Sequence, residues 1–368
     1  MAVSYRKWAD APASLIKSVN ASRAEYRRLG RSGLLVSNPI LGGAHIGDPG
    51  WSPWALNEKD GLSLLKAAYD RGINTWDTAN VYSNGGSEQI MGKVLKLHNI
   101  PRSKVIIMTK CFRPVTDPQI DPDVRTPTLY SMDLARKSKD YVNHFGLSRA
   151  AIFQQVEASL RRLDTDYIDV LLIHRFDHNV PPEETMKALH DLVQMNKVRF
   201  LGACSMWAHE LAILQHVADK NGWTKFIAMQ NHYNLLYREE EREMNKYCNR
   251  TGVGLIPWSP LAAGKLARDP SQPADTFRGA NGTLYQDHNP AQSEEIVRRV
   301  HKVAMSHRWP MSHVALAWLN KRVTAPVIGF STADRIDEAL SARGISLLDK
   351  DEKYLEECYW PQVIQGHS

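Results

Sequence analysis

Short apolar runs alternate with amphipathic stretches along most of the chain, in a regular strand–helix order. The strand-like runs are rich in β-branched residues and end in polar or turn residues, as INTWD does over 73–77. The helix-like stretches repeat apolar residues at spacings of three and four, as Leu62, Leu65 and Ala68 do over 58–71. This alternation predicts a parallel sheet whose strands are joined by crossover helices.

Eight strand–helix units follow one another from Tyr26 onward. After a first strand ending at 42–43, we predict strands at 73–77, 105–110, 168–174, 198–204, 226–230, 254–258 and 325–329. We predict helices at 58–71, 88–97, 149–163, 183–196, 207–220, 239–250, 294–306, 312–321 and 333–342. Because eight units favour a closed barrel over a doubly wound sheet, the expected fold is a single-domain (β/α)8 TIM barrel of the α/β class.

The remaining segments complete the expected domain plan. The sequence over 26–43 predicts a short hairpin that caps the barrel and leads into the first strand. We expect residues 1–25 to form a flexible or loosely packed extension, 26–345 the barrel, and 346–368 a C-terminal tail. Two long connections, 111–148 and 259–293, follow the third and seventh strands; loops of this length at a barrel mouth are usually functional.

Composition is typical of a soluble globular protein, with 43% hydrophobic and 23% charged residues over 368 positions. The net charge of +6 and the pI near 9.0 suit an anionic partner. The basic residues are scattered, however, with clusters only at 22–31 and 136–139. That scatter argues against a nucleic-acid partner and favours a phosphorylated small-molecule cofactor.

Cysteine usage and hydropathy indicate a cellular compartment. The four cysteines show no CxxC spacing and no regular rhythm: Cys111, Cys204, Cys248 and Cys358. We therefore expect a reducing, cytoplasmic environment without a disulfide framework or structural zinc. No apolar run reaches the length of a signal peptide or a membrane span, so no membrane partner is expected.

His174 and His178 are four residues apart, a spacing that suits two metal ligands on a helix. The sequence over 176–182 predicts a loop, however, so no metal site is expected.

Four polar residues lie at or just beyond predicted strand ends: Asp77 and Tyr82 in INTWDTANVYSNG, Lys110 in KVIIMTKC, and His174 in YIDVLLIHRFD. The carboxyl ends of barrel strands converge on one mouth, so we expect these side chains to meet there. A nearby ammonium lowers the pKa of a tyrosine, which is ordinarily near 10, and Asp77 can hold the ammonium of Lys110 in place. Such a group can protonate a carbonyl oxygen while a hydride attacks its carbon, with His174 orienting the carbonyl.

Each of these residues also has a purely structural interpretation. An Asp–Lys pair at strand ends is often a structural ion pair, and a histidine there is often a hydrogen-bonded core residue. The charge run over 239–242 is most simply the solvated start of a helix. No GxGxxG motif follows a predicted strand, so we do not expect a Rossmann-type cofactor site.

In their order along the chain, the four residues resemble the catalytic tetrad of the aldo-keto reductase superfamily. Supporting motifs are GACSMW over 202–207, QNHYNLLYREEEREM over 230–244 and PWSPLAAGKL over 257–266. The resemblance covers about 26–342 and extends to fungal secondary-metabolism reductases of the versiconal hemiacetal acetate reductase type. It implies an oxidoreductase that uses NADPH/NADP+ to reduce an aldehyde or ketone, such as an aromatic polyketide or another secondary-metabolite intermediate.

The resemblance also implies roles for particular residues. Tyr82 matches the proton donor, Lys110 and Asp77 match its tuning pair, and His174 matches the substrate-orienting residue. The implied cofactor-binding residues are Asp77, Ser205, Gln230, Trp258, Ser259, Pro260, Leu261, Gly264, Lys265, Gly329, Ser331, Thr332, Arg335 and Glu338.

Within this set, each group matches one part of the cofactor. Ser205 and Gln230 match positions that bind the nicotinamide carboxamide, and Trp258 matches the aromatic residue that stacks on the nicotinamide ring. The segment 257–264 would wrap the pyrophosphate. Ser331 and Arg335 would bind a 2′-phosphate, which favours NADPH over NADH.

Three positions depart from the family pattern. Met206 stands where an asparagine is frequent, Ala339 replaces an asparagine that commonly meets the adenine, and Phe330 replaces a cationic or small residue. We expect these departures to affect cofactor affinity and to leave the fold unchanged.

Substrate contacts beyond His174 are less specific. Trp51 and Trp54 follow the first strand and suit either an aromatic wall at the mouth or surface packing. Tyr130 lies in the connection 111–148, which is either a substrate lid or a mobile surface loop.

Two other functions fit the same residues. The chain resembles, through its superfamily, NADPH-binding regulatory subunits of ion channels. It would also suit a non-redox dehydratase or cyclase in which Tyr82 acts as the acid. In each case we expect a monomer or homo-oligomer, and for an enzyme a small carbonyl substrate.

Overall fold

The computed structural model describes residues 11–116, 132–271 and 288–367. Within them, eight parallel strands form one sheet in the order β10-β3-β4-β5-β6-β7-β8-β9. The strands are β3 (Ile40–Gly42), β4 (Thr75–Asp77), β5 (Ile106–Cys111), β6 (Ile168–Ile173), β7 (Val198–Cys204), β8 (Phe226–Gln230), β9 (Gly254–Leu255) and β10 (Val327–Ile328). A parallel bridge between Trp258 and Val327 joins the two edges, and the Thr324 amide donates to the Leu255 carbonyl at 2.9 Å. The sheet closes on itself, which confirms the predicted (β/α)8 barrel.

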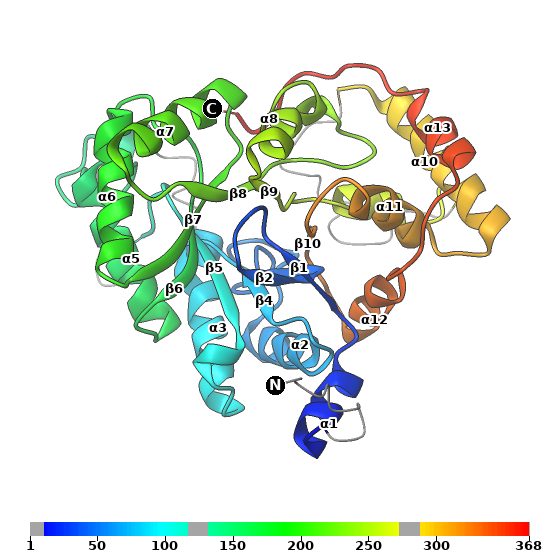
Figure 1. The fold of residues 1–368 in the computed structure, drawn as a ribbon, viewed down its shortest axis with the longest axis horizontal. Coiled ribbons are helices and arrows are strands. Elements are labelled where there is room, and N and C mark those ends of the chain that lie inside the picture. Colours follow the sequence, from blue (N-terminus) through cyan, green and yellow to red (C-terminus); the bar gives the residue numbers. More distant parts are fainter. Residues whose placement is uncertain (1–10, 117–131, 272–287, 368) are drawn as a thin grey trace, which may run out of the picture.

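Helices pack around the outside of the sheet (Figure 1). They are α2 (Glu58–Asp70), α3 (Gly86–Leu97), α5 (Arg149–Leu163), α6 (Pro182–Gln194), α7 (Ala208–Asn221), α8 (Met244–Thr251), α10 (Pro290–His307), α11 (Met311–Asn320) and α12 (Ala333–Ser341). Polar side chains begin several of them: Asn57 accepts from the Asp60 amide at 3.0 Å and Ser148 from the Ala151 amide at 3.3 Å. Such caps satisfy amides that have no partner inside the helix.

The predicted hairpin, β1 (Glu25–Arg28) and β2 (Leu35–Asn38), closes the amino-terminal end of the barrel. Leu29 and Val36 from the hairpin belong to the same buried apolar cluster as residues in or next to the barrel strands, namely Ile40, Met108, Val170, Leu172, Ala228, Ile256, Ala325 and Val327. At the hairpin turn, Gly30 has φ +59°, and a Cβ there would lie 2.3 Å from the Gly252 carbonyl oxygen. With this end plugged, the open mouth lies at the carboxyl ends of the strands.

The two shortest strands of the barrel have only two residues each, and a proline lies within two residues of each. We predicted strands over 254–258 and 325–329, but regular pairing covers only β9 and β10. Pro257 and Pro326 lie beside these strands and have no N–H to donate, so the ladder is interrupted at each.

One predicted helix, 239–250, divides into a 3₁₀ turn, η5 (Glu239–Glu241), and the helix α8. The prediction of a solvated charge run was wrong here, because Glu239 and Glu240 are both buried. Glu239 accepts from the Tyr359 hydroxyl at 2.8 Å, and Glu240 lies 2.8 Å from His367. These partners come from the C-terminal segment and are remote in sequence.

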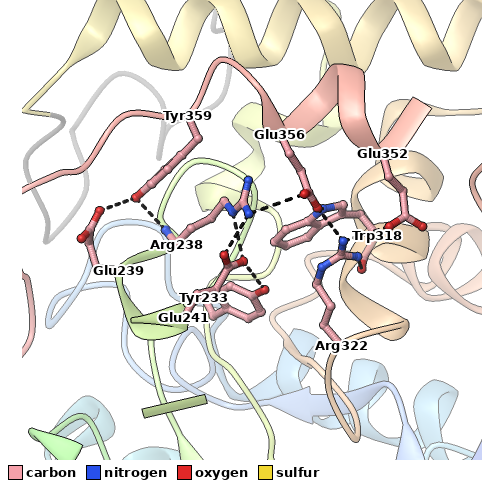
Figure 2. Close-up of polar contacts among 9 residues, drawn as sticks. All are labelled: Tyr233, Arg238, Glu239, Glu241, Trp318, Arg322, Glu352, Glu356 and Tyr359. Atoms are coloured by element: carbon pink, nitrogen blue, oxygen red, sulfur yellow. Dashed lines mark hydrogen bonds and ion pairs between the residues drawn. The ribbon is translucent and has the colours of Figure 1, made fainter. Parts of the chain in front are cut away.

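A charged network, absent from the sequence prediction, holds helix α13 (Asp349–Glu356) against α11 (Figure 2). Glu356 accepts from the Trp318 indole at 2.7 Å, and Glu352 pairs with Arg322 at 2.9 Å. The helix sequence DKDEKYLE has few apolar positions, so no periodicity marked it.

The same network continues into the loop after β8. Arg238 pairs with Glu241 at 2.8 Å and lies 3.6 Å from Glu356, while Glu241 accepts from the Tyr233 hydroxyl at 2.6 Å. We call Arg238, Glu241, Trp318, Arg322, Glu352 and Glu356 the C-terminal network. It ties α13 to two separate parts of the barrel (Figure 2).

Two further short helices lie in segments for which none was predicted. Helix α1 (Ala13–Ala21) falls in the N-terminal extension and buries none of its residues, and α4 (Met132–Ala135) falls in the connection 111–148. Among the described residues, no helix is long and apolar enough to cross a membrane.

Candidate active site

Asp77 and Lys110 lie side by side at the carboxyl ends of the adjacent strands β4 and β5. The Lys110 ammonium donates to both Asp77 carboxylate oxygens, at 2.8 and 2.7 Å, and to the Thr78 carbonyl at 2.8 Å. The Lys110 side chain has no solvent exposure. Burial is the largest single influence on Lys110 and lowers its pKa, but the charge and hydrogen bond of Asp77, together with Tyr82 and Cys204, raise that pKa to about 12. Lys110 is therefore a fixed cation at neutral pH.

Tyr82 follows β4 in a strained turn that directs its ring toward Lys110. Ser83, Asn84 and Gly85 in the turn η2 (Tyr82–Gly85) all have positive φ, at 50°, 49° and 95°. A side-chain contact supports this backbone, since the Ser83 hydroxyl accepts from the Asp48 amide at 3.1 Å. The Lys110 Nζ atom lies 5.2 Å from the centroid of the Tyr82 ring. Backbone strain of this kind persists where the surroundings hold it, and it clusters at functional sites.

The pKa of Tyr82 is shifted in the direction opposite to the one predicted from the sequence. Burial raises the pKa of Tyr82 to about 12, while the charge of Lys110 and a hydrogen bond with it act in the opposite direction. We predicted a net lowering because the sequence shows the neighbouring ammonium but not the depth of burial. Tyr82 is thus a protonated phenol at neutral pH, beside a cation that stabilises its conjugate base.

His174 completes the group from the end of β6. Its backbone amide donates to the Cys111 carbonyl at 2.9 Å, and its ring meets the Tyr82 ring edge-on with centroids 6.0 Å apart. Burial, followed by the charges of Arg175 and Lys110, lowers the pKa of His174 well below its usual value. The imidazole is therefore neutral. Its Nδ1 atom is buried and has no hydrogen-bond partner among the residues that the structure describes.

Three of the predicted cofactor residues adjoin this cluster. Gln230 at the end of β8 donates to an Asp77 oxygen at 2.8 Å. Ser205 follows β7 with φ 36°, and its hydroxyl accepts from the Trp258 indole at 3.1 Å. The structure thus links the predicted carboxamide-binding pair to the tetrad on one side and to the predicted stacking ring on the other.

The Trp258 ring is part of a stack of three aromatic rings. His232 lies parallel to it at 4.1 Å, and Tyr237 lies parallel to His232 at 4.3 Å. In the same loop, the Asn234 side chain donates to the Ser259 carbonyl at 2.9 Å. Sequence reasoning missed His232 and Asn234, although the motif QNHYN contains both. One face of Trp258 is covered by His232, so a ligand ring would stack against the other.

The segment after Trp258 has an unusual backbone. Ser259, Ala262, Ala263 and Gly264 all have positive φ, at 55°, 47°, 55° and 93°. Successive turns of this kind orient backbone amides toward a common point and favour anions. Pro260 is buried, Leu261 is half-buried and Lys265 is exposed.

The last group of predicted cofactor residues surrounds the start of α12. Because Trp258 pairs with Val327, the segment after β10 starts beside the segment after β9. Ser331, Thr332 and Arg335 are exposed, and Thr332 caps the helix by accepting from the Arg335 amide. Arg335 forms no ion pair with any described residue.

Four other positions near α12 have partners or close neighbours within the protein. Gly329 faces His45, where a Cβ would lie 3.0 Å from the ring. The Glu338 carboxylate accepts from the Ser312 hydroxyl, which leaves it less able to meet an adenosine than expected. Phe330 and Ala339, two of the departures from the family pattern, are buried, as is Met206.

Together these residues have the chemistry to hold a nicotinamide dinucleotide. A half-buried indole with one covered face suits a flat ring, the positive-φ segment 259–264 suits a pyrophosphate, and the exposed Arg335 suits a phosphate.

Of the predicted substrate residues, Trp51 and Trp54 are half-buried in the connection between β3 and α2, at the mouth end. The Trp51 indole nitrogen is buried without a hydrogen-bond partner in the described part of the chain. Tyr130, together with the rest of 117–131 in the predicted lid, lies outside the described residues.

Comparison with known proteins defines the class to which this barrel belongs. Residues 40–359 match the aldo/keto reductase family, and the chain belongs to that family. It is therefore an oxidoreductase of the kind that acts on carbonyl groups of small molecules with a nicotinamide cofactor.

Individual relatives extend this similarity over the whole chain. The aldo-keto reductase AMT2 of Alternaria alternata is 72% identical over 366 residues, covering 100% of both chains. The versiconal hemiacetal acetate reductase of Aspergillus parasiticus is 46% identical over 346 residues, covering 92% of this chain and 98% of the relative. A putative aryl-alcohol dehydrogenase of Schizosaccharomyces pombe is 45% identical, covering 93% and 97%. The predicted resemblance to the family and its fungal secondary-metabolism members is confirmed.

Proposed function

We propose that this protein uses NADPH to reduce an aldehyde or ketone, with Tyr82 as the proton donor. The observation that carries the proposal is the geometry around Lys110. Its buried ammonium is held by both oxygens of Asp77, beside the Tyr82 ring, which meets His174 edge-on. A lysine serving only as one half of a structural ion pair would not require a strained turn to bring a tyrosine beside it.

Each residue has a chemical task in this proposal. When bound, the reduced nicotinamide supplies a hydride to the carbonyl carbon. As the C=O π electrons move onto oxygen, Tyr82 delivers its proton there and becomes a phenolate. Lys110 stabilises that phenolate, and Asp77 keeps Lys110 charged and in place. Neutral His174 can donate a hydrogen bond to the same carbonyl oxygen and fix its direction.

A preference for NADPH over NADH rests on Arg335. The guanidinium is exposed at the start of α12 and has no ion-pair partner among described residues. A phosphate offers it two parallel charge-assisted hydrogen bonds, whereas the ribose hydroxyl of NADH offers one neutral partner.

For the substrate we propose a secondary-metabolite intermediate, with an aromatic polyketide carbonyl as the first candidate. Support comes from the similarity to versiconal hemiacetal acetate reductase and from the half-buried Trp51 and Trp54 near the mouth. We also place the protein in the cytoplasm, because all four cysteines are free and three are buried.

The test is the loss of NADPH absorbance at 340 nm with a panel of aromatic ketones, aliphatic ketones, aldehydes and 2-oxo acids, each product being identified as the alcohol. We expect one class to be turned over with one NADPH consumed per alcohol formed. Tight NADPH binding without turnover on any class would instead favour a regulatory subunit. Product formed without NADPH would favour a dehydratase or cyclase.

A further inference from the structure

A buried glutamine on helix α5, Gln155, has all of its hydrogen-bonding capacity in use. Only 5% of the residue is exposed. Its side-chain nitrogen donates to the Gly146 and Ala151 carbonyls, both at 3.0 Å. Its side-chain oxygen accepts from the Phe112 amide at 2.7 Å and from the Asn80 side chain at 3.0 Å. A buried amide satisfied in this way holds its partners in one arrangement.

The partners of Gln155 lie on the two segments that carry the reacting groups. Asn80 is two residues before Tyr82, and Phe112 is two residues after Lys110. Asn80 also donates from its side chain to the Arg113 carbonyl at 2.9 Å and from its backbone to the Lys110 carbonyl at 3.1 Å. The Asn80–Gln155 pair therefore connects the segment after β4 to the segment after β5, beyond the point where strand pairing ends.

The backbone at this junction needs such support. Phe112 has φ 150°, an uncommon conformation for a residue with a side chain. The Phe112 carbonyl accepts from the Gly146 amide at 2.7 Å. Gln155 therefore bonds to two segments, at Phe112 and at Gly146, that also bond to each other. Without the Gln155 oxygen, a buried Phe112 amide would lose its partner, which is costly in a protein interior.

We propose that Gln155, acting through Asn80 and Phe112, is a positioning residue that sets the geometry between Tyr82 and Lys110. The inference rests on the proposed function, in which Lys110 stabilises the phenolate that Tyr82 becomes when it donates its proton. Gln155 contacts neither of them directly. Its effect on catalysis arises because proton transfer depends steeply on distance, and a displacement of about 1 Å can cost roughly a hundredfold in rate.

The chain offers a matched control in Gln215 on helix α7. Only 9% of Gln215 is exposed, and its side chain exchanges two hydrogen bonds with the Phe226 backbone, at 3.0 and 2.9 Å. Phe226 begins β8, at the end of the barrel opposite the mouth. Gln155→Leu and Gln215→Leu are thus the same substitution in buried helix glutamines, at the two opposite ends of the barrel.

The experiment compares both variants by kinetics and by amide hydrogen exchange. For Gln155→Leu we expect kcat to fall about ten- to a hundredfold, with a larger solvent deuterium isotope effect and an NADPH Kd within about twofold of wild type. Exchange should accelerate in peptides covering 78–84 and 110–114. For Gln215→Leu we expect similar thermal destabilisation, but a kcat within about twofold of wild type and an unchanged isotope effect.

A second variant guards against misfolding of the first. Asn80→Ala should reproduce the fall in kcat, and the double variant should lose less than the product of the two single losses, because both residues belong to one unit. If Gln155→Leu behaves like Gln215→Leu while Tyr82→Phe is inactive, the inference is overturned and the proposed function stands. Unchanged exchange over 78–84 and 110–114 overturns the inference whatever the turnover, so a failure of the proposed function is seen separately.

Discussion

Two charged clusters in this molecule differ in almost every physical respect. In the first, at the mouth, a single ammonium with no solvent exposure is held by one carboxylate, Asp77, beside the strained turn of Tyr82. In the second, the C-terminal network, acids and bases alternate so that Glu356 meets both Arg322 and Arg238. Its charged side chains are partly exposed, and Arg322 and Arg238 also lie over the buried Trp318 ring (Figure 2).

The difference indicates what each cluster is for. Burying an isolated ion pair such as Asp77–Lys110 carries a desolvation cost that the attraction between the two charges only partly offsets. Such an arrangement is poor as a source of stability and well suited to fixing the protonation states of its neighbours. A partly exposed network loses little solvation, and several shared partners let it hold a polar helix such as α13 in place. We therefore expect changes at the mouth to alter the chemistry and changes in the C-terminal network to alter stability.

The largest effect should come from Lys110→Met, which removes the cation beside Tyr82. We expect kcat to fall roughly a hundred- to ten-thousandfold, because proton donation by a positioned acid is typically worth that much. NADPH binding, followed by tryptophan fluorescence, should remain. A kcat within a few fold of wild type would show that Lys110 is only structural.

Arg335→Ala tests a third kind of charge, one that is exposed and has no ion-pair partner in the described chain. We expect the Kd for NADPH to rise about ten- to a hundredfold, from the loss of an exposed, charge-assisted contact worth about 1.5–3 kcal/mol in total, with little change for NADH. Arg28→Ala, at an exposed position of the hairpin, is the matched control. Equal losses for both cofactors would show that Arg335 does not recognise the phosphate.

His232 is a neutral histidine, and the free-energy cost of protonating it in the folded protein can be measured from how folding stability depends on pH. Burial lowers the pKa of His232 to about 3, below the unfolded value near 6.5. The unfolded chain then binds the extra proton between these values, so stability is intact above pH 6.5 and is lost as pH falls toward 3. We expect a loss of roughly 2 kcal/mol by pH 5, and His232→Phe should remove that part of the dependence. Parallel pH–stability curves for both proteins would contradict the burial argument.

The smallest effect should come from Glu356→Gln in the C-terminal network. Loss of a partly exposed ion pair costs about 1 kcal/mol, which for a chain of this length corresponds to a melting temperature lower by about 1–2 °C. The kcat and the NADPH Kd should stay at wild-type values. A tenfold loss of kcat would break the contrast between the two clusters.

The sequence predicted the barrel because its strands and helices have strong, regular periods, and a family resemblance supplied the tetrad and cofactor positions. Helix α13 escaped prediction because its sequence has little apolar periodicity and tertiary ion pairs hold it in place. The direction of the overall shift in the Tyr82 pKa could not be predicted, since it depends on burial by residues distant in sequence. Gln155 escaped for the same reason: its partners at Asn80 and Phe112 come together only in the folded barrel.

The most direct test of the central claim is a single-turnover measurement on Tyr82→Phe, which removes one hydroxyl and retains the ring. NADPH-loaded protein would be mixed with the preferred carbonyl substrate, and absorbance at 340 nm would follow hydride transfer. We expect the rate to fall roughly a hundred- to ten-thousandfold while the NADPH Kd stays within about twofold of wild type. A wild-type rate in Tyr82→Phe would contradict the assignment of Tyr82 as the proton donor.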